Sequence, residues 1–350
     1  MARLARLKLS MTVSILLVTI IFAGFMVALT FLIQLPPIPS LTIAIFGTLL
    51  FILLQYLIGP AIVRWSTKLH YLKPGENPWL ETTVKDLAEK SNIPQPKLAI
   101  VPDKTPNAFV FGRTTKGATL AVHEGLLRQL TQEEVKGVIG HELGHIKHKD
   151  FVVMTVLSSL PILAYLIARL SFRVALATDG GSKKKGGEVA FRVLLVVAAV
   201  VSYIVYIITL LCVMRLSRLR EHYADAYSAY VTGEPRQLQS ALTKITYGLS
   251  LSPKPPHGAR TLYIGDPALA KQECQGLMQR KEEYDLDKDG VLDARELELA
   301  MEREAKSRWT TINTWFATHP ATFQRILLLR EIEKEMSSGR YSGERIYAQI

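Results

Sequence analysis

Long runs of uncharged, apolar residues limit the folds that this chain can adopt. Residues 11–33 contain no charged side chain, and neither do residues 41–63, which follow a short proline-rich segment. A helix needs about 20 apolar residues to cross the hydrocarbon core of a bilayer, whereas a cleaved signal peptide has an apolar region of about 7–15 residues. Both runs therefore predict retained transmembrane helices that form a hairpin.

Two later runs, residues 151–170 and 190–214, are also predominantly apolar and predict a second helical hairpin. Its glycine-rich tip, residues 179–188, contains three consecutive lysines, which a hairpin that spans the bilayer would place on the outer side. This placement conflicts with the positive-inside rule, whereas the earlier basic segments agree with it. We therefore expect four spans, with a second hairpin that enters the bilayer only in part as the alternative.

The charge of the chain agrees with contact to a membrane. The formal net charge is +11, and 49% of the residues are hydrophobic. Basic residues flank the apolar runs and form no patch interleaved with aromatic residues, so the expected partner is the lipid bilayer and not nucleic acid. Basic segments at residues 1–8 and 64–73 place both outer ends of the first hairpin in the cytoplasm. We expect a multi-pass integral protein of the cell or inner membrane and, with only two cysteines, no disulfide framework.

The sequence His141-Glu142-Leu143-Gly144-His145 is an H-E-x-x-H motif. Residues four apart lie on one face of a helix, so His141 and His145 can bind one metal ion, and Glu142 can reach a metal-bound water without being a ligand. Thr131 and Glu134 form a capping box that predicts where this helix begins. The motif also arises by chance, so the assignment of a zinc site requires a third ligand elsewhere in the chain.

Helix geometry suggests that ligand. If the second hairpin is symmetric about its tip, Glu221 returns to the level of the H-E-x-x-H pair. Two imidazoles and one carboxylate form the ligand set of a catalytic zinc site, and Asp225, one turn further on, can bind the outer nitrogen of a ligating histidine. The alternative is a solvated helix face on which both carboxylates pair with neighbouring arginines.

The sequence resembles the HtpX-like membrane zinc metalloproteases, which are gluzincins related to the CAAX prenyl protease. The resemblance rests on the segments at residues 106–109, 121–150, 217–226 and 318–326 and on the apolar hairpin, which occur in the family's order. It implies a mainly α fold with a small antiparallel β element, about four transmembrane helices and a cytoplasmic catalytic domain.

The same resemblance implies roles for individual residues. The glutamate of an R-x-x-E-x-x-x-D pattern is the family's third zinc ligand, which corresponds to Glu221, with Arg218 and Asp225 completing the pattern and supporting the ligands. A later T-H-P-x-x-x-R-I pattern places on His319 the role of holding the oxyanion. The implied reaction is hydrolysis, with Glu142 as general base for a zinc-activated water. From the residues alone, a histidine before a proline would be an ordinary helix-start residue.

We expect the substrates to be membrane or misfolded proteins or their peptides, as in protein quality control and stress response. The strand around Asn107, Ala108 and Phe109 would bind extended substrate by strand addition, and a plain scaffold strand is the alternative. Other functions compatible with the sequence are processing of lipidated CAAX-type peptides and a catalytically inactive calcium-binding membrane scaffold. Four spans argue against the first, and an intact Glu142 argues against the second.

A second metal motif lies between Glu221 and His319. Residues 285–296 match the twelve-residue EF-hand calcium loop. The matching ligand positions are Asp285, Asp287, Asp289, Val291 through its carbonyl, Asp293 and Glu296. The incoming arm departs from the EF-hand pattern at Arg280 and Lys281, and the loop has no second EF-hand to pair with. We therefore expect a bound Ca²⁺ that either only stabilises the loop or orders the insert and places His319.

Together these patterns predict four parts of the chain. They are an N-terminal transmembrane hairpin at 1–63, a first catalytic part at 64–150, a second transmembrane hairpin at 151–214 and a second catalytic part at 215–350. The EF-hand-like insert occupies about residues 266–305. Within the first catalytic part we expect an amphipathic helix over residues 77–90 and about three antiparallel strands between residues 96 and 122.

Overall fold

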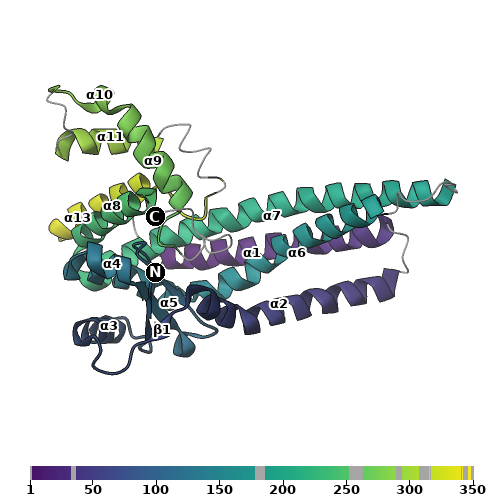
Figure 1. Ribbon diagram of the computed structural model, residues 1–350, viewed down its shortest axis with the longest axis horizontal. Coiled ribbons are helices and arrows are strands. Elements are labelled where there is room, and N and C mark those ends of the chain that lie inside the picture. Colours follow the sequence, from purple (N-terminus) through teal and green to yellow (C-terminus); the bar gives the residue numbers. More distant parts are fainter. Residues whose placement is uncertain are drawn as a thin grey trace. The chain divides into compact units, whose positions relative to one another are not determined.

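The computed structural model describes residues 2–32, 37–177, 186–251, 263–288, 294–306, 315, 317–339, 341 and 346–347 (Figure 1). The chain divides into two units. The apolar unit consists of Lys8–Gly59 and Val153–Leu216, and the mixed unit, which contains helices and strands, consists of Met1–Leu7, Pro60–Val152 and Ser217–Ile350.

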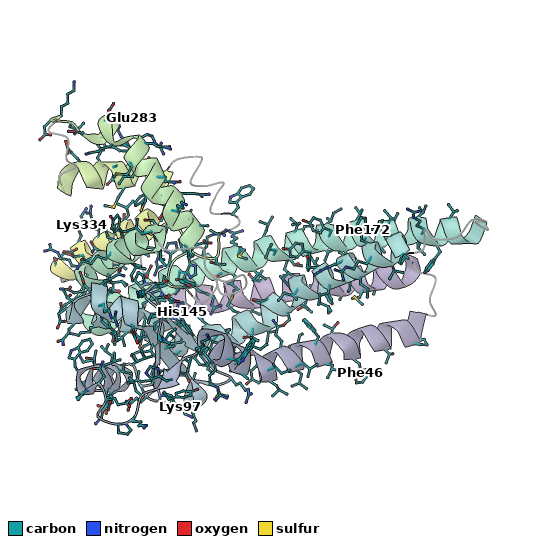
Figure 2. All side chains as sticks on the ribbon, viewed as in Figure 1. Phe46, Lys97, His145, Phe172, Glu283 and Lys334 are labelled. Atoms are coloured by element: carbon teal, nitrogen blue, oxygen red, sulfur yellow. The ribbon has the colours of Figure 1, made fainter. Side chains whose placement is uncertain are left out.

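The apolar unit is built from parts of four long helices, namely α1 (Ala2–Leu32), α2 (Pro37–Thr67), α6 (Asp150–Ala177) and α7 (Gly186–Thr232). Its core joins side chains of α1, α6 and α7, namely Val18, Phe22, Phe25, Leu157, Leu160, Ala164, Val213 and Leu216. Large apolar side chains also face outward, including Phe46 at 69% and Phe172 at 51% exposure (Figure 2). An exterior of this kind is favourable in lipid and unfavourable in water.

Helices long and apolar enough to cross a membrane number three among the described residues. They are Ile45–Thr67, Asp150–Ala177 and Val189–Thr232. Within α1, the stretch Thr12–Val27 is apolar but shorter, so a fourth span there stays a prediction. Most of the glycine-rich tip predicted at residues 179–188, with its lysines, lies outside the described residues.

A small sheet in the mixed unit has the strand order β1-β2-β4-β3. The strands are β1 (His70–Tyr71), β2 (Lys97–Val101), β3 (Ala108–Phe111) and β4 (Thr119–His123). β2 and β4 are parallel, while the other two pairs are antiparallel. The sequence suggested an antiparallel element, but the sheet is mixed. The reason is the path of the chain. After β2 the chain skips one strand position to form β3 at the edge, and the β3–β4 hairpin then places β4 between β2 and β3.

Helix α5 (Gln132–His148) begins as the sequence predicted. The Thr131 side chain accepts a hydrogen bond from the Glu134 amide, and the Glu134 carboxylate accepts one from the Thr131 amide. Val135, Val138 and Ile139 are buried and form the inward face of the helix.

Two glycines of α5 allow α7 to approach closely. A Cβ atom on Gly144 would lie 3.1 Å from the Ala224 Cα, and one on Gly140 would lie 2.9 Å from the Ser228 Oγ. The Ser228 hydroxyl donates to the carbonyl of Gly137 at 2.6 Å. Small residues on both helices therefore bring their backbones together next to the H-E-x-x-H motif.

The remaining helices complete the mixed unit. The predicted amphipathic helix is α3 (Pro78–Lys90), capped by the Asn77 side chain. Helices α4 (Glu124–Gln129) and α8 (Pro235–Leu251) follow, and α13 (Thr322–Ser337) lies near the carboxyl terminus. The insert contains α9 (Pro267–Gln279), which begins after its N-cap Asp266, then α10 (Lys281–Tyr284) and α11 (Ala294–Lys306).

Candidate metal centre

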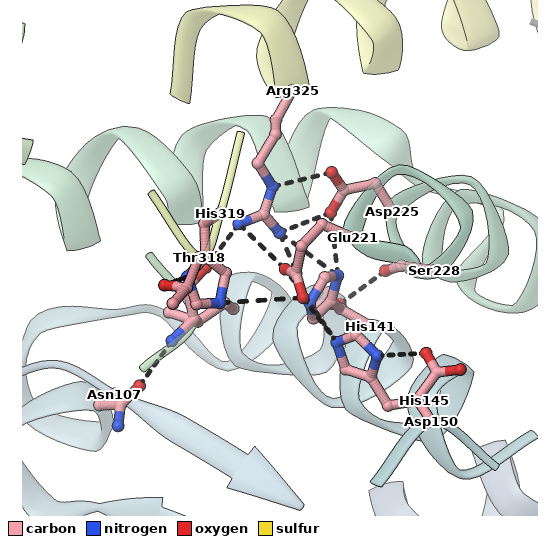
Figure 3. Close-up of polar contacts among 12 residues, drawn as sticks. Asn107, His141, His145, Asp150, Glu221, Asp225, Ser228, Thr318, His319 and Arg325 are labelled. Atoms are coloured by element: carbon pink, nitrogen blue, oxygen red, sulfur yellow. Dashed lines mark hydrogen bonds and ion pairs between the residues drawn. The ribbon is translucent and has the colours of Figure 1, made fainter. Parts of the chain in front are cut away.

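Helices α5 and α7 bring His141, His145 and Glu221 together (Figure 3). The Nε2 atoms of the two histidines are 3.1 Å apart. Each lies 3.4 Å from an oxygen of the Glu221 carboxylate. Ligand atoms at about 2.0–2.1 Å from a tetrahedral zinc ion are about 3.3–3.4 Å from one another. The three donors therefore have the spacing of zinc ligands.

Carboxylates orient both imidazoles from behind. Asp225 Oδ1 lies 2.9 Å from His141 Nδ1, and Asp150 Oδ2 lies 2.7 Å from His145 Nδ1. Because a carboxylate only accepts, each histidine donates from Nδ1, and this orientation directs Nε2, the atom that would bind a metal, toward the other donors. Asp225 stands where the sequence predicted a partner.

Asp150 contacts the donor set, although no sequence pattern pointed to it. It follows Lys149, whose left-handed conformation (φ 59°) ends α5 and turns the chain back toward His145. Its other oxygen, Oδ1, pairs with Arg220 Nε at 2.9 Å, and both side chains are buried. The signal in the sequence is an aspartate five residues after the second histidine of the motif.

Arg325 of α13 binds Asp225 as well. Its Nε and Nη2 atoms donate to the two oxygens of Asp225 at 2.8 and 2.7 Å. Nη1 donates to the carbonyl of Ile264 and lies 3.6 Å from Glu221 Oε2. The carboxylates raise the pKa of Arg325 despite its burial, so its charge is permanent. The sequence analysis mentioned this arginine only as part of a motif.

The donor set fits a metal ion. Glu221 Oε2 is buried and has no hydrogen-bond partner among the described residues, although Arg325 and His141 lie close to it. Buried carboxylate oxygens are almost always satisfied, and a shared cation would satisfy this one. Two imidazoles and one carboxylate suit zinc, so His141, His145 and Glu221 are the residues that would hold it.

Glu142 and His319 interact electrostatically with donors of this set. Glu142 is 3% exposed, and burial raises the pKa of its carboxyl. His319 Nε2 lies 3.8 Å from Glu221 Oε1, and its Nδ1 lies 2.8 Å from the Thr318 hydroxyl. Burial lowers the pKa of His319, which keeps the imidazole neutral. The structure thus brings both predicted catalytic residues to the donor set.

Arg218 contacts the chain that precedes His319. Its Nη1 donates to the carbonyls of Trp315 at 3.2 Å and Ala317 at 3.1 Å. These carbonyls belong to the segment that leads to His319. Arg218 therefore supports the site by holding that segment.

Asn107 also has a structural partner. Its side-chain oxygen accepts a hydrogen bond from the Ile264 amide at 2.9 Å, and the Ile264 carbonyl is the one that Arg325 binds. Ala108 and Phe109 lie on β3, at the edge of the sheet, with buried side chains. Substrate binding by this strand stays a prediction.

Part of the predicted calcium loop is described. Asp285, Asp287 and Glu296 each place an oxygen within 4.8 Å of the others. Glu296 Oε1 already accepts the amides of Leu286 at 2.6 Å and Asp287 at 3.3 Å. The other predicted ligand positions, Asp289, Val291 and Asp293, lie outside the described residues.

The arms of the loop are tied together by polar contacts. Arg280, one of the two departures from the EF-hand pattern, pairs with Glu304 of α11 at 2.7 Å, and the Tyr284 hydroxyl donates to the same carboxylate at 2.5 Å. The basic residue at this position therefore joins the incoming arm to the outgoing arm.

Comparison with known proteins identifies the family of the chain. The model of Peptidase family M48 matches residues 74–333. A Protease HtpX homolog of Aeropyrum pernix is 39% identical over 194 residues, which are 55% of this chain and 59% of the relative, so the chain spans about six-tenths of that relative's length. Protease HtpX homolog 2 of Methanosarcina acetivorans is 32% identical over 284 residues, or 81% of this chain and 82% of the relative.

Among solved structures, the crystal structure of S. mikatae Ste24p matches 91% of this chain and 63% of that chain, with 16% identity and a TM-score of 0.46. The M48 match contains all the residues gathered at the site, from Asn107 to Arg325. With the three apolar helices found among its described residues, the chain is an integral membrane protein that belongs to peptidase family M48.

Proposed function

We propose that this protein is a zinc-dependent endopeptidase that cleaves membrane or misfolded proteins at the cytoplasmic side of the membrane. One observation carries the proposal: the Nε2 atoms of His141 and His145 and the carboxylate oxygens of Glu221 lie 3.1–3.4 Å apart, which suits a tetrahedral zinc ion. Zinc bound there would polarise the scissile carbonyl and make water a nucleophile at neutral pH.

Glu142 is the general base in this proposal. It neighbours His141 in the chain and is buried. Burial raises its pKa, which brings the pKa closer to neutral pH than that of an exposed glutamate. A base with a pKa nearer the working pH can both accept the proton of the attacking water and return it to the leaving amine. His319 would donate from Nε2 to the developing oxyanion, and the contact of its Nδ1 with the Thr318 hydroxyl supports this role.

The choice of substrate follows from the membrane helices and the sheet. Exposed apolar helices imply that the protein resides in a bilayer, where membrane proteins are accessible to it. The edge position of β3 supports binding of an extended peptide by strand addition, with Asn107, Ala108 and Phe109 in the binding strand. Basic residues that flank the first hairpin favour a cytoplasmic site.

The decisive experiment compares Glu142→Gln with wild-type protein in detergent, with a membrane-protein substrate and casein. We expect cleavage to fall by at least about 100-fold, because the amide cannot accept a proton. Zinc content should stay at one ion per chain, because Glu142 is not a ligand in this proposal.

Glu133→Gln is the matched control, since Glu133 is exposed on the same helix. It should leave both cleavage and zinc content unchanged. Cleavage by Glu142→Gln at the wild-type rate would exclude Glu142 as the base. Absence of zinc from active wild-type protein would exclude the proposed mechanism.

We also propose that the loop at residues 285–296 binds calcium. The convergence of Asp285, Asp287 and Glu296 supports it, together with the match of the whole loop to the EF-hand pattern. Calorimetric titration of the zinc-loaded protein with Ca²⁺ tests this, with Glu296→Gln as the variant and Glu302→Gln, exposed on α11, as the control. Only Glu296→Gln should lose binding, and equal binding by all three proteins would refute the site.

Peptidase assays at fixed zinc, with and without calcium, then decide whether calcium modulates activity. A change in rate in the wild-type protein that Glu296→Gln abolishes would support modulation. An unchanged rate would leave calcium with a stabilising role alone.

A further inference from the structure

Helix α9 of the insert packs directly against the segment that carries His319. Leu269 of α9 forms an apolar cluster with Ala317 and Ala321, which lie two residues before and two residues after His319. The insert is therefore in contact with the candidate site, although its calcium loop lies further along the chain.

One turn along α9, Glu273 makes a polar contact with the same segment. Its Oε1 atom accepts a hydrogen bond from the Thr322 amide at 2.8 Å. Thr322 is the first residue of α13, and the N-cap residue, Ala321, has no side-chain oxygen to offer. The first amides of a helix lack partners within the helix, so Glu273 supplies from α9 the cap that α13 itself lacks.

This cap restrains His319 because little chain separates the two. Only Pro320 and Ala321 lie between His319 and Thr322, and the proline ring limits the backbone rotation. On the other side, Arg218 holds the carbonyls of Trp315 and Ala317. The position of the His319 imidazole is thus determined by contacts on both sides of it.

We propose that Glu273 is a positioning residue for His319: by binding the Thr322 amide, it holds the His319 imidazole in reach of the substrate's oxyanion. This inference rests on the proposed peptidase function. It assigns to the insert a role in the reaction that does not depend on whether the loop binds calcium.

The environment of Glu273 argues against a chance contact. The side chain is 8% exposed, and its second oxygen, Oε2, has no hydrogen-bond partner among the described residues. Burial raises the pKa of Glu273 to about 7, so the charged form is unfavourable there. An apolar side chain would pack at this position at lower cost, but it could not bind the amide.

The experiment compares Glu273→Met with Glu273→Gln. Methionine fills a similar volume without an acceptor, whereas glutamine keeps one. For Glu273→Met we expect kcat to fall by about 10- to 100-fold with KM and zinc content unchanged, because a displacement of about 1 Å at a catalytic group has effects of this size. Glu273→Gln should stay within about threefold of wild type, and Gln275→Met, exposed on α9, is the control.

A second pair of variants tests the donor of this hydrogen bond, the Thr322 amide. Thr322→Pro deletes the amide proton at the first helical position, where proline is well tolerated. Ala321 already has φ −56° and ψ 136°, which suits a residue before proline. Thr322→Val keeps the amide and removes the hydroxyl that contacts Thr246, so it is the matched control. Thr322→Pro should lower kcat as Glu273→Met does, and the double variant should be no worse than either.

Hydrogen exchange of the peptide covering residues 317–326 supplies a readout that does not need activity. Exchange should be at least about tenfold faster in Glu273→Met than in wild type or Glu273→Gln, since each factor of ten reflects a lost hydrogen bond of ordinary strength. If wild-type protein cleaves nothing, the peptidase function fails while this comparison still tests the cap. Equal protection in both variants, equal kcat, or a glutamine variant as impaired as the methionine variant would overturn the role of Glu273.

Discussion

Replacing Asp150 with asparagine tests how the metal centre is assembled. Asp150 accepts from His145 Nδ1 through one oxygen and pairs with Arg220 through the other. Asparagine has nearly the same shape, but only one of its two terminal atoms accepts. In Asp150→Asn, either His145 loses its acceptor or Arg220 faces an amide nitrogen.

The expected magnitudes follow from these two contacts. Loss of a carboxylate behind a ligating histidine lowers metal affinity by about 10- to 100-fold, equivalent to about 1.4–2.7 kcal/mol. A reversed histidine tautomer would place the proton on Nε2, where it blocks metal binding. The pair of Asp150 and Arg220 has side-chain exposures of only 3% and 4%, so breaking it should destabilise the metal-free protein by up to about 3–5 kcal/mol.

Two assays separate these effects. Zinc affinity is measured by competition with a chromophoric chelator, and stability by thermal unfolding of protein treated with EDTA. Asp86→Asn removes the same charge at an exposed position of α3 and should change neither quantity. If Asp150→Asn bound zinc within twofold of wild type, the assignment of Asp150 as the residue that orients His145 would be refuted.

Two further predictions concern buried charges. The pKa of Glu273, about 7, lies above its ordinary 4.5, so the folded protein holds this proton more tightly than the unfolded one and the free energy of unfolding falls as pH rises through that window, by at most about 3 kcal/mol. Glu273→Gln should escape this loss, and thermal unfolding at pH 5 and pH 8 would contradict the prediction if both proteins gave parallel changes. Arg325→Met should destabilise the protein by about 3–5 kcal/mol, because it leaves Asp225 buried without its cation. Arg128→Met, at an exposed position, should cost less than about 0.5 kcal/mol in the same unfolding assay, and equal effects of the two would contradict the prediction.

Features that depend on short stretches of chain could be predicted well. The four-residue spacing of His141 and His145 places both on one helix face, and the capping box at Thr131 determines where that helix begins. The helix after Asn77 and the one after Asp266 follow from the same kind of local signal. Each depends on hydrogen bonds between residues a few positions apart, which are visible in the sequence.

The residues that surround the H-E-x-x-H motif in space were harder to predict. Glu221 and Asp225 could be placed near the motif because a helical hairpin has a regular rise along each arm. Asp150 could not, because α5 ends at His148 and the left-handed conformation of Lys149 breaks the helical periodicity before Asp150. The parallel pairing of β2 with β4 was missed for a similar reason, since strand order depends on the path of the connecting loop.

The sequence by itself determined that this chain has membrane-spanning helices and an H-E-x-x-H helix, because apolar length and helical periodicity are properties of continuous segments. Only the tertiary structure decided which residues hold the site in place. Arg325 on Asp225, Arg218 on the carbonyls before His319 and Glu273 on the Thr322 amide all join positions far apart in the chain. Such contacts depend on how the helices pack, and no local pattern of residues specifies that packing.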